Sequence, residues 1–135
     1  MMIKQLSVFL ENKTGRLTDI TGILAEHNIN ISAFSIADSA DFGILRMITS
    51  DNHTAERMLR EQGIAVQTTD VVCLIVPHAP GGLHKPLQLL SSHNIQIDYM
   101  YAYATGTHAI VAIRTPTPQD TLTLLKEHNY QFLEE

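Results

Sequence analysis

The chain of 135 residues has no tryptophan and a single cysteine, Cys73. One cysteine can form neither a disulfide nor a cluster of thiolate ligands within its own chain. Cys73 lies inside the apolar run VVCLIV, where we expect a buried and unreactive thiol. The composition therefore excludes a disulfide framework and a thiolate metal cluster within one chain.

Basic residues are scarce. Nine Lys and Arg stand against fourteen Asp and Glu, which gives a formal net charge of −5. Nucleic acids and anionic membranes are bound through clustered Lys and Arg, whereas these nine are scattered along the chain. We therefore expect no nucleic-acid partner and no membrane partner.

Long apolar runs and catalytic motifs are also missing. No stretch approaches the roughly 18 apolar residues of a membrane helix, and the N-terminus MMIKQLSVFLENK lacks the features of a secretory signal. A cytoplasmic location is the expectation. The sequence contains no G-x-S-x-G, H-E-x-x-H or G-x-x-x-x-G-K motif. We expect no enzyme.

What the chain does contain is a repeat of itself, the feature that most affects a fold assignment. The segment LENKTGRLTDITGILAEHNINI aligns with VPHAPGGLHKPLQLLSSHNIQI, and the offset between Gly15 and Gly81 is 66 residues. In the following hairpin the alignment slips by one residue and places Ile48 on Ile113. The repeat predicts two modules, residues 1–69 and 70–135.

Each half has the same pattern of elements. Residues 3–10 alternate between apolar and polar, as in a half-buried strand. Leu17, Ile20 and Leu24 recur at steps of three and four, which is typical of an amphipathic helix over about 16–27. Two strands around a turn at 38–41, a helix over about 53–62 and a short strand over 64–68 complete the half. The order βαββαβ predicts an α+β, ferredoxin-like module with an antiparallel sheet and both helices on one face.

Further local signals agree with this order. Asn28 and Asn94 stand where a left-handed helix cap is expected, and Gly63 does so after the second helix. The continuous apolar run at 71–77 predicts a central strand buried on both faces. Because about 67 residues bury too little surface to be comfortably stable alone, we expect the two modules to pack as a pair and to dimerise.

The loop between the first strand and first helix of each copy is marked by glycine. These loops read Asn12-Lys13-Thr14-Gly15-Arg16-Leu17 and His78-Ala79-Pro80-Gly81-Gly82-Leu83. Glycine allows a ligand to approach the main-chain N–H groups at a helix N-terminus, a place that favours a carboxylate. The alternative, that Gly15 and Gly81 only make tight turns, stays open.

These segments resemble a known family, the ACT domains, which are small regulatory modules of βαββαβ topology that bind amino acids. ENKTGRL is similar to the family's N-x-P-G-x-L loop, and LAEHNINI is similar to its L-x-x-x-x-I-N-I helix exit and second strand. The second copy matches as APGGL and LSSHNIQI. The resemblance covers the chain in two copies and leaves no room for a catalytic domain.

The resemblance implies that a free amino acid lies at the interface between modules. Its ligand-binding groups would be Asn12, Thr14, Gly15, Arg16 and Leu17 in one loop, and His78, Ala79, Pro80, Gly81, Gly82 and Leu83 in the other. These loops would face Asn30-Ile31 or Gln96-Ile97 of a partner module. Loop N–H groups would hold the α-carboxylate, and a strand carbonyl or Asp98 the ammonium. The resemblance further implies a homodimer that regulates an enzyme of amino-acid metabolism. It implies no cofactor.

The second copy departs from the family pattern at Pro86, where the helix should already be under way. A proline at the fourth helical position clashes with the carbonyl four residues earlier, so either the helix begins near Pro86 or its first turn is distorted. The loop over 78–85 would then be longer and wider. The second pocket is either adapted to a particular ligand or part of a purely structural half. In the first copy, Thr14 replaces the family's proline, a mild change.

Tyrosines and histidines are further candidates for site residues. Tyr99, Tyr101 and Tyr103 alternate along one strand, so their rings share a face and serve either packing or a pocket wall. Asp98 beside them receives an ammonium group or faces solvent. The seven histidines lack the tight spacing of metal ligands, so we expect no metal site. His27 and His93 lie in the last turn of a helix, where an imidazolium gains from the helix dipole.

The sequence favours a non-catalytic regulatory protein that binds an amino acid. The alternative is a ferredoxin-like scaffold that binds another protein and no small ligand. An enzyme or a metal-binding protein is the third and weakest candidate.

Overall fold

The computed structural model describes residues 2–11, 13–38 and 42–134. The chain divides into two compact units, Lys4–Thr69 and Asp70–Glu135, and the second includes Met1–Ile3. Within the described ranges, no helix is long and apolar enough to cross a membrane.

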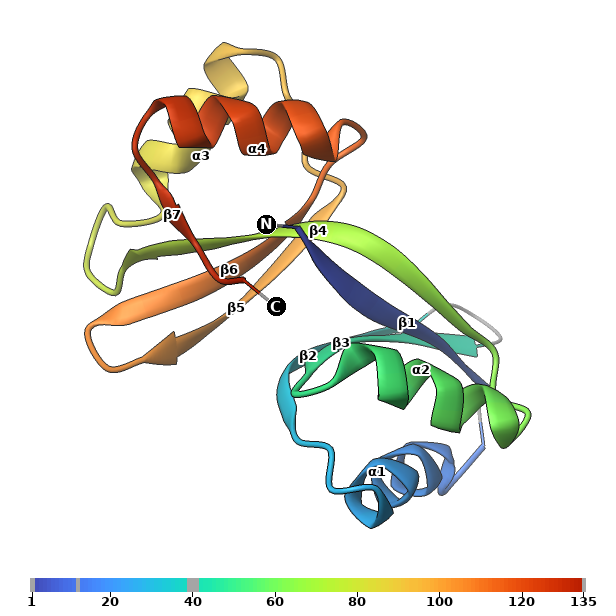
Figure 1. Cartoon of the computed structure of the whole chain (residues 1–135). Coiled ribbons are helices and arrows are strands. Elements are labelled where there is room, and N and C mark those ends of the chain that lie inside the picture. Colours follow the sequence, from blue (N-terminus) through green and yellow to red (C-terminus); the bar gives the residue numbers. More distant parts are fainter. Residues whose placement is uncertain (1, 12, 39–41, 135) are drawn as a thin grey trace. The chain divides into compact units, whose positions relative to one another are not determined.

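The sheet of the first unit contains strands β2, β3 and β1, in that order, and the start of β4. Its elements are β1 (Ile3–Glu11), α1 (Arg16–Glu26), β2 (Ile31–Asp38), β3 (Phe42–Thr49), α2 (Asn52–Glu61) and the beginning of β4 (Val66–Pro77). Strand β3 pairs antiparallel with both β1 and β2. Both helices of this unit lie on the same face of its strands (Figure 1).

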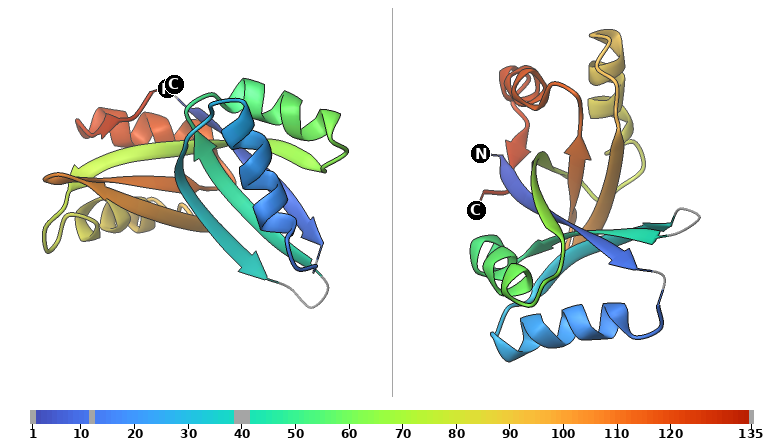
Figure 2. Two further views of the ribbon diagram at one scale, coloured as in Figure 1. Left: turned by 90° about the horizontal axis from the view of Figure 1, so that it is seen from below. Right: turned by 90° about the vertical axis from the view of Figure 1, so that its right-hand side faces the viewer.

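The second unit repeats this arrangement. The remainder of β4 is followed by α3 (His84–Ser92), β5 (Tyr99–Thr105), β6 (His108–Arg114), α4 (Pro118–Glu127) and β7 (Gln131–Phe132). Strand β6 pairs antiparallel with β4 and β5, and β7 pairs with β4. Seen from below in Figure 2, the strands of this unit lie in front of α3 and α4, so both helices cover one face. Hydrogen bonds link the strands in the order β2-β3-β1-β4-β6-β5. The predicted pair of ferredoxin-like βαββαβ modules is confirmed.

The strand register shows that the repeat keeps its offset of 66 residues throughout. Leu6 pairs with Met47, and Val72 pairs with Ile113 in the same way. The expected slip that aligns Ile48 with Ile113 is therefore wrong. Side chains alternate between the two faces of a strand, so a shift of one residue would have moved Ile113 out of the core that it shares with Val72.

Each unit has its own apolar core between sheet and helices, built from equivalent positions. The core residues of the first unit that have an equivalent in the core of the second are Leu6, Val8, Leu10, Leu24, Leu45, Met47 and Leu59. Their counterparts at the offset of 66 are Val72, Leu74, Val76, Leu90, Val111, Ile113 and Leu125. Along β4, Val71, Val72, Cys73 and Leu74 are fully buried, which confirms the predicted strand buried on both faces.

Helix α3 begins at His84, two residues later than the offset from Arg16 predicts. The cause is Pro86. A helix that began at residue 82 would need a hydrogen bond from the nitrogen of Pro86, which has no hydrogen, and would bring the ring against the carbonyl four residues earlier. Of the two expected outcomes, a helix that starts near Pro86 is the one observed. Pro86 is itself buried, at the position that corresponds to Ile20.

Three helices end in a His-Asn pair with a shared geometry. The asparagines Asn28, Asn94 and Asn129 have φ values of 56°, 56° and 64°, which confirms the two predicted asparagine caps and adds a third. Gly63, the cap predicted after the second helix, is also left-handed, with φ of 77°. The Nδ1 atoms of His27, His93 and His128 lie 2.8, 3.1 and 3.0 Å from the carbonyl oxygens of Ile23, Leu89 and Leu124. Because a carbonyl can only accept, each Nδ1 carries the donated hydrogen.

We expect Asn94→Ala to lower the free energy of unfolding by about 1 kcal/mol, because an alanine in the left-handed region meets steric strain that asparagine tolerates better. Asn94→Gly avoids this strain and should lie close to the wild type. Urea unfolding of both variants measures the difference. An equal loss of stability in both would show that the backbone conformation is not the cause.

Candidate functional site

The loop between β1 and α1 borders a cleft of about 310 Å³ in the first unit. The lining residues are Leu10, Glu11, Lys13, Gly15, Arg16, Leu17, Thr18, Ile36, Phe42 and Gly43. This volume is at the lower end of the range of small-molecule sites, about 300–1,000 Å³. The cleft is therefore large enough for a small metabolite.

The N-terminus of α1 opens at this cleft. Gly15 occupies the cap position with φ of 90°, a left-handed conformation, and no described side chain caps the helix. The first helical hydrogen bond runs from the N–H of Asp19 to the carbonyl of Gly15 at 2.9 Å. The N–H groups of Leu17 and Thr18 precede this bond and lack a partner within the helix. Such a helix end attracts an anion.

Charges of both signs lie beside this helix end. The carboxylate of Glu11 contacts Nζ of Lys13 at 3.1 Å and Nη2 of Arg16 at 3.3 Å. Hydrogen bonds from Lys13 and then from Arg16 lower the pKa of Glu11. All three side chains are accessible to solvent, so these ion pairs are weak and open to exchange.

The corresponding loop of the second unit carries none of these charges. At the offset of 66, Glu11, Lys13 and Arg16 are replaced by Pro77, Ala79 and Gly82. A Cβ atom on Gly82 would lie 2.1 Å from the carbonyl oxygen of Pro77, so no side chain fits there. The backbone path of this loop thus excludes a counterpart of Arg16.

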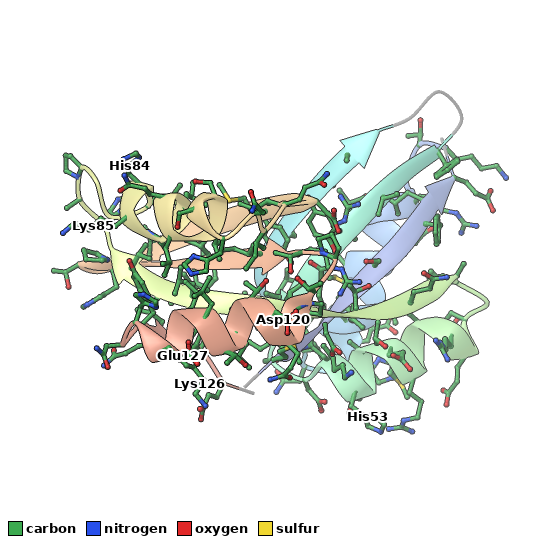
Figure 3. All side chains as sticks on the ribbon, turned by 90° about the horizontal axis from the view of Figure 1, so that it is seen from above. His53, His84, Lys85, Asp120, Lys126 and Glu127 are labelled. Carbon is green, nitrogen blue, oxygen red and sulfur yellow. The ribbon has the colours of Figure 1, made fainter. Side chains whose placement is uncertain are left out.

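The first turn of α3 also differs from that of α1. His84 and Lys85 lie at the N-terminal end of α3 (Figure 3), where α1 has Thr18 and Asp19. The turn of α1 includes an acidic residue and that of α3 has none. The two helix ends therefore present different charges to solvent.

The structure brings together part of the predicted first-loop site. Gly15, Arg16 and Leu17 line the cleft, and Thr14 is an exposed residue of the same turn. Asn12 lies outside the described residues. Asn30 and Ile31 lie at the other end of the sheet, because Ile31 pairs with Thr49 whereas Glu11 pairs with Phe42. Within one unit, they cannot share a site with the loop.

In the second unit the predicted site residues are likewise separated. The loop His78–Leu83 follows Pro77, which pairs with His108, whereas Tyr99 pairs with Arg114 at the opposite end of β6. The sequence pattern predicts Gln96 and Ile97 at the start of a strand. Strand β5 begins only at Tyr99, so both residues lie in the preceding loop. The register shift between Ile31 and Ala33 lets the pairing of β2 with β3 extend to Thr49. In the second unit the pairing of β5 with β6 ends at Arg114.

The tyrosines of β5 share one face, as predicted. Tyr101 pairs with Ala112, the neighbour of the core residue Val111, so the three rings lie on the sheet face away from the helices. They are half-buried, and burial together with the nearby Cys73 raises the pKa of Tyr103. Asp98 is exposed to solvent.

Several lining residues were not predicted from the sequence. Ile36, Phe42 and Gly43 come from β2 and β3, and only the folded sheet brings them beside the β1–α1 loop. Glu11 had a detectable signal, because the charges of ENKTGR at positions 11, 13 and 16 have no counterpart in the second copy. Among the described residues, no group of three or more His, Cys, Asp or Glu is placed to hold a metal ion.

Two units of one βαββαβ topology, the first with an open loop cleft, define a tandem of ferredoxin-like modules. The family model of the ACT domain pair matches residues 1–135. The chain belongs to this family.

Solved structures agree with this assignment. Protein BT0572 from Bacteroides thetaiotaomicron is 47% identical, with a TM-score of 0.94 over 98% of this chain and 92% of that one. The regulatory subunit of aspartate kinase from Thermus thermophilus, in its ligand-free form, is 15% identical, with a TM-score of 0.65 over 93% and 92%. That from Thermus flavus is 16% identical, with a TM-score of 0.61 over 92% and 90%. The two aspartate kinase subunits share the fold. No curated protein matches the sequence.

We expect Arg16→Gln and, to a greater extent, Lys13→Gln to raise the pKa of Glu11, since Lys13 makes the larger contribution. A pKa lowered by folding means that Glu11 stabilises the fold above its unfolded pKa, and that this stabilisation is lost as the pH falls through its folded pKa. Carbon-13 NMR titration of the Glu11 carboxyl measures the shift. Arg57→Gln, at an exposed arginine of α2, is the control and should leave the titration unchanged.

We expect Gly82→Ala to destabilise the protein by more than about 1 kcal/mol, because its Cβ would overlap the carbonyl oxygen of Pro77. Gly22 offers a matched control, since a Cβ there meets nothing within 4 Å. Gly22→Ala lies in a helix and should stabilise by up to about 1 kcal/mol. Thermal unfolding compares the two. A Gly82→Ala variant as stable as the wild type would contradict the described loop.

Proposed function

We propose that the chain is a non-catalytic regulatory protein that binds a free amino acid in the cleft of the first unit. The observation that carries this proposal is the meeting of Glu11, Arg16 and the open end of α1 at one cleft. An amino acid is a zwitterion and needs charges of both signs within a few ångströms. This cleft offers both.

The two ends of the zwitterion have distinct partners in this arrangement. The α-carboxylate takes the N–H groups of Leu17 and Thr18 together with the guanidinium of Arg16. The ammonium group takes the carboxylate of Glu11 in place of Lys13. Because Glu11 and Arg16 are already paired and partly solvated without ligand, binding exchanges ion pairs, and the displaced Lys13, whose side chain is 72% exposed, returns to solvent.

The regulatory step is a change of assembly. A ligand that contacts two modules at once stabilises their liganded arrangement relative to the unliganded one. In this proposal a homodimer brings Asn30-Ile31 or Gln96-Ile97 of another module to face the loop. An enzyme of amino-acid metabolism binds one of the two arrangements and is regulated by the change, in keeping with a fold shared with the regulatory subunits of aspartate kinase.

The second unit serves a structural role in this proposal. Its loop His78–Leu83 lacks the counterparts of Glu11 and Arg16, and Gly82 packs against the chain itself. In this proposal Asp98 and Tyr99 contact a ligand that another module holds. One ligand per chain is the expected stoichiometry.

Calorimetric titration of the full chain with each of the twenty amino acids tests the proposal. We expect at least one to bind, and both Arg16→Gln and Glu11→Gln to weaken it about tenfold or more, since a hydrogen bond to a charged group contributes about 1.5–3 kcal/mol. Arg57→Gln is the matched control and should bind like the wild type. Failure of every amino acid to bind at millimolar concentration would contradict the proposal and favour the protein-binding scaffold.

A further inference from the structure

The walls of the cleft carry information about the side chain of the ligand. Large apolar residues are normally buried, yet among the described residues six remain exposed: Phe9, Leu17, Phe34, Ile36, Phe42 and Met100. Leu17, Ile36 and Phe42, which are 37%, 46% and 41% exposed, all line this one cleft. They belong to α1, β2 and β3, so the fold gathers exposed apolar surface from three elements at one place.

We propose that the cleft selects amino acids with an apolar side chain, an inference that rests on the amino-acid site proposed above. Leu17, Ile36 and Phe42 lose water contact when such a side chain enters, and the removal of apolar surface from water is favourable. The charged lining residues, Glu11, Lys13 and Arg16, all lie at the loop, where they meet the backbone groups of the ligand.

Among the described lining residues beyond the loop, a charged ligand side chain finds no ion-pair partner. Beyond the loop, the described lining consists of Leu10, Ile36, Phe42 and Gly43, with Thr18 as the one polar side chain. A lysine or aspartate side chain would lose water there without a compensating ion pair, which is costly. Polar and charged amino acids are therefore disfavoured by the same walls.

Gly43 leaves the space that such a side chain needs. A Cβ atom built there would lie 3.8 Å from both Ile36 Cγ2 and Leu10 Cβ, two other lining residues, so it would fill the cleft at ordinary contact distance. The φ of Gly43 is not in the left-handed region, so its replacement introduces no backbone strain. In the second unit the equivalent residues of Ile36, Phe42 and Gly43 are Ala102, His108 and Ala109. The apolar walls and the charges are thus both confined to the first unit.

Calorimetric titration with L-leucine, L-phenylalanine, L-alanine, L-lysine and L-aspartate tests the preference. We expect L-leucine or L-phenylalanine to bind about tenfold or more tightly than L-alanine, and L-lysine and L-aspartate to bind most weakly. Equal or tighter binding of L-lysine or L-aspartate overturns the preference and leaves the amino-acid site intact. Absence of binding by all twenty amino acids overturns both.

A size probe separates the cleft walls from general stability. Gly43→Val should weaken L-leucine and L-phenylalanine about tenfold and L-alanine by less than about threefold, because only the larger side chains reach the filled space. Ala109→Val, the equivalent change in the second unit, should leave every affinity unchanged. Circular dichroism checks folding, and Gly43→Ala gives a smaller effect of the same kind if the valine variant does not fold. Equal weakening of all ligands by both Gly43 variants overturns the inference.

Discussion

The apolar face of each antiparallel sheet, covered by two helices, is the constraint on which the rest of this structure depends. Strand residues that alternate between faces place Leu6 and Val8 in one core and Val72 and Leu74 in the other, with the same spacing. Because a shift of one residue would turn every such side chain to the wrong face, the register of the repeat is held at 66 residues. Loops and helix starts can then vary without loss of the fold.

Variation is greatest at the loop that follows the first strand of each unit. In the first unit, Gly15 begins α1 with a left-handed residue and leaves the helix end open beside Glu11 and Arg16. In the second, Pro86 delays the helix by two residues and Gly82 packs against the carbonyl of Pro77. One loop thus leaves main-chain N–H groups at an open helix end, whereas the other is a tight turn that admits no side chain at Gly82. This chain therefore combines two copies of one fold with two different loops after the first strand.

Much of the fold could be predicted from local pattern. Amphipathic periodicity marked the helices, Asn28 and Asn94 marked two helix ends, and the run VVCLIV marked the buried strand. The lining of the candidate cleft was predicted only where it is local in sequence, at Gly15, Arg16 and Leu17. Ile36 and Phe42 were missed because an exposed apolar residue on a strand has the same pattern as a buried one. The slipped alignment of Ile48 failed because identity of residue type does not reveal which face a side chain occupies.

The sequence by itself determined the topology, the duplication and the family, since each rests on periodicity and motifs that are readable along the chain. The sequence also predicted, from Pro86, that the two loops differ, but only the tertiary structure decided what form each loop takes. The reason is steric and electrostatic: the space at Gly82 and the ion pairs of Glu11 depend on backbone paths that no residue pattern specifies. The convergence of α1, β2 and β3 on one cleft is likewise a property of the folded sheet.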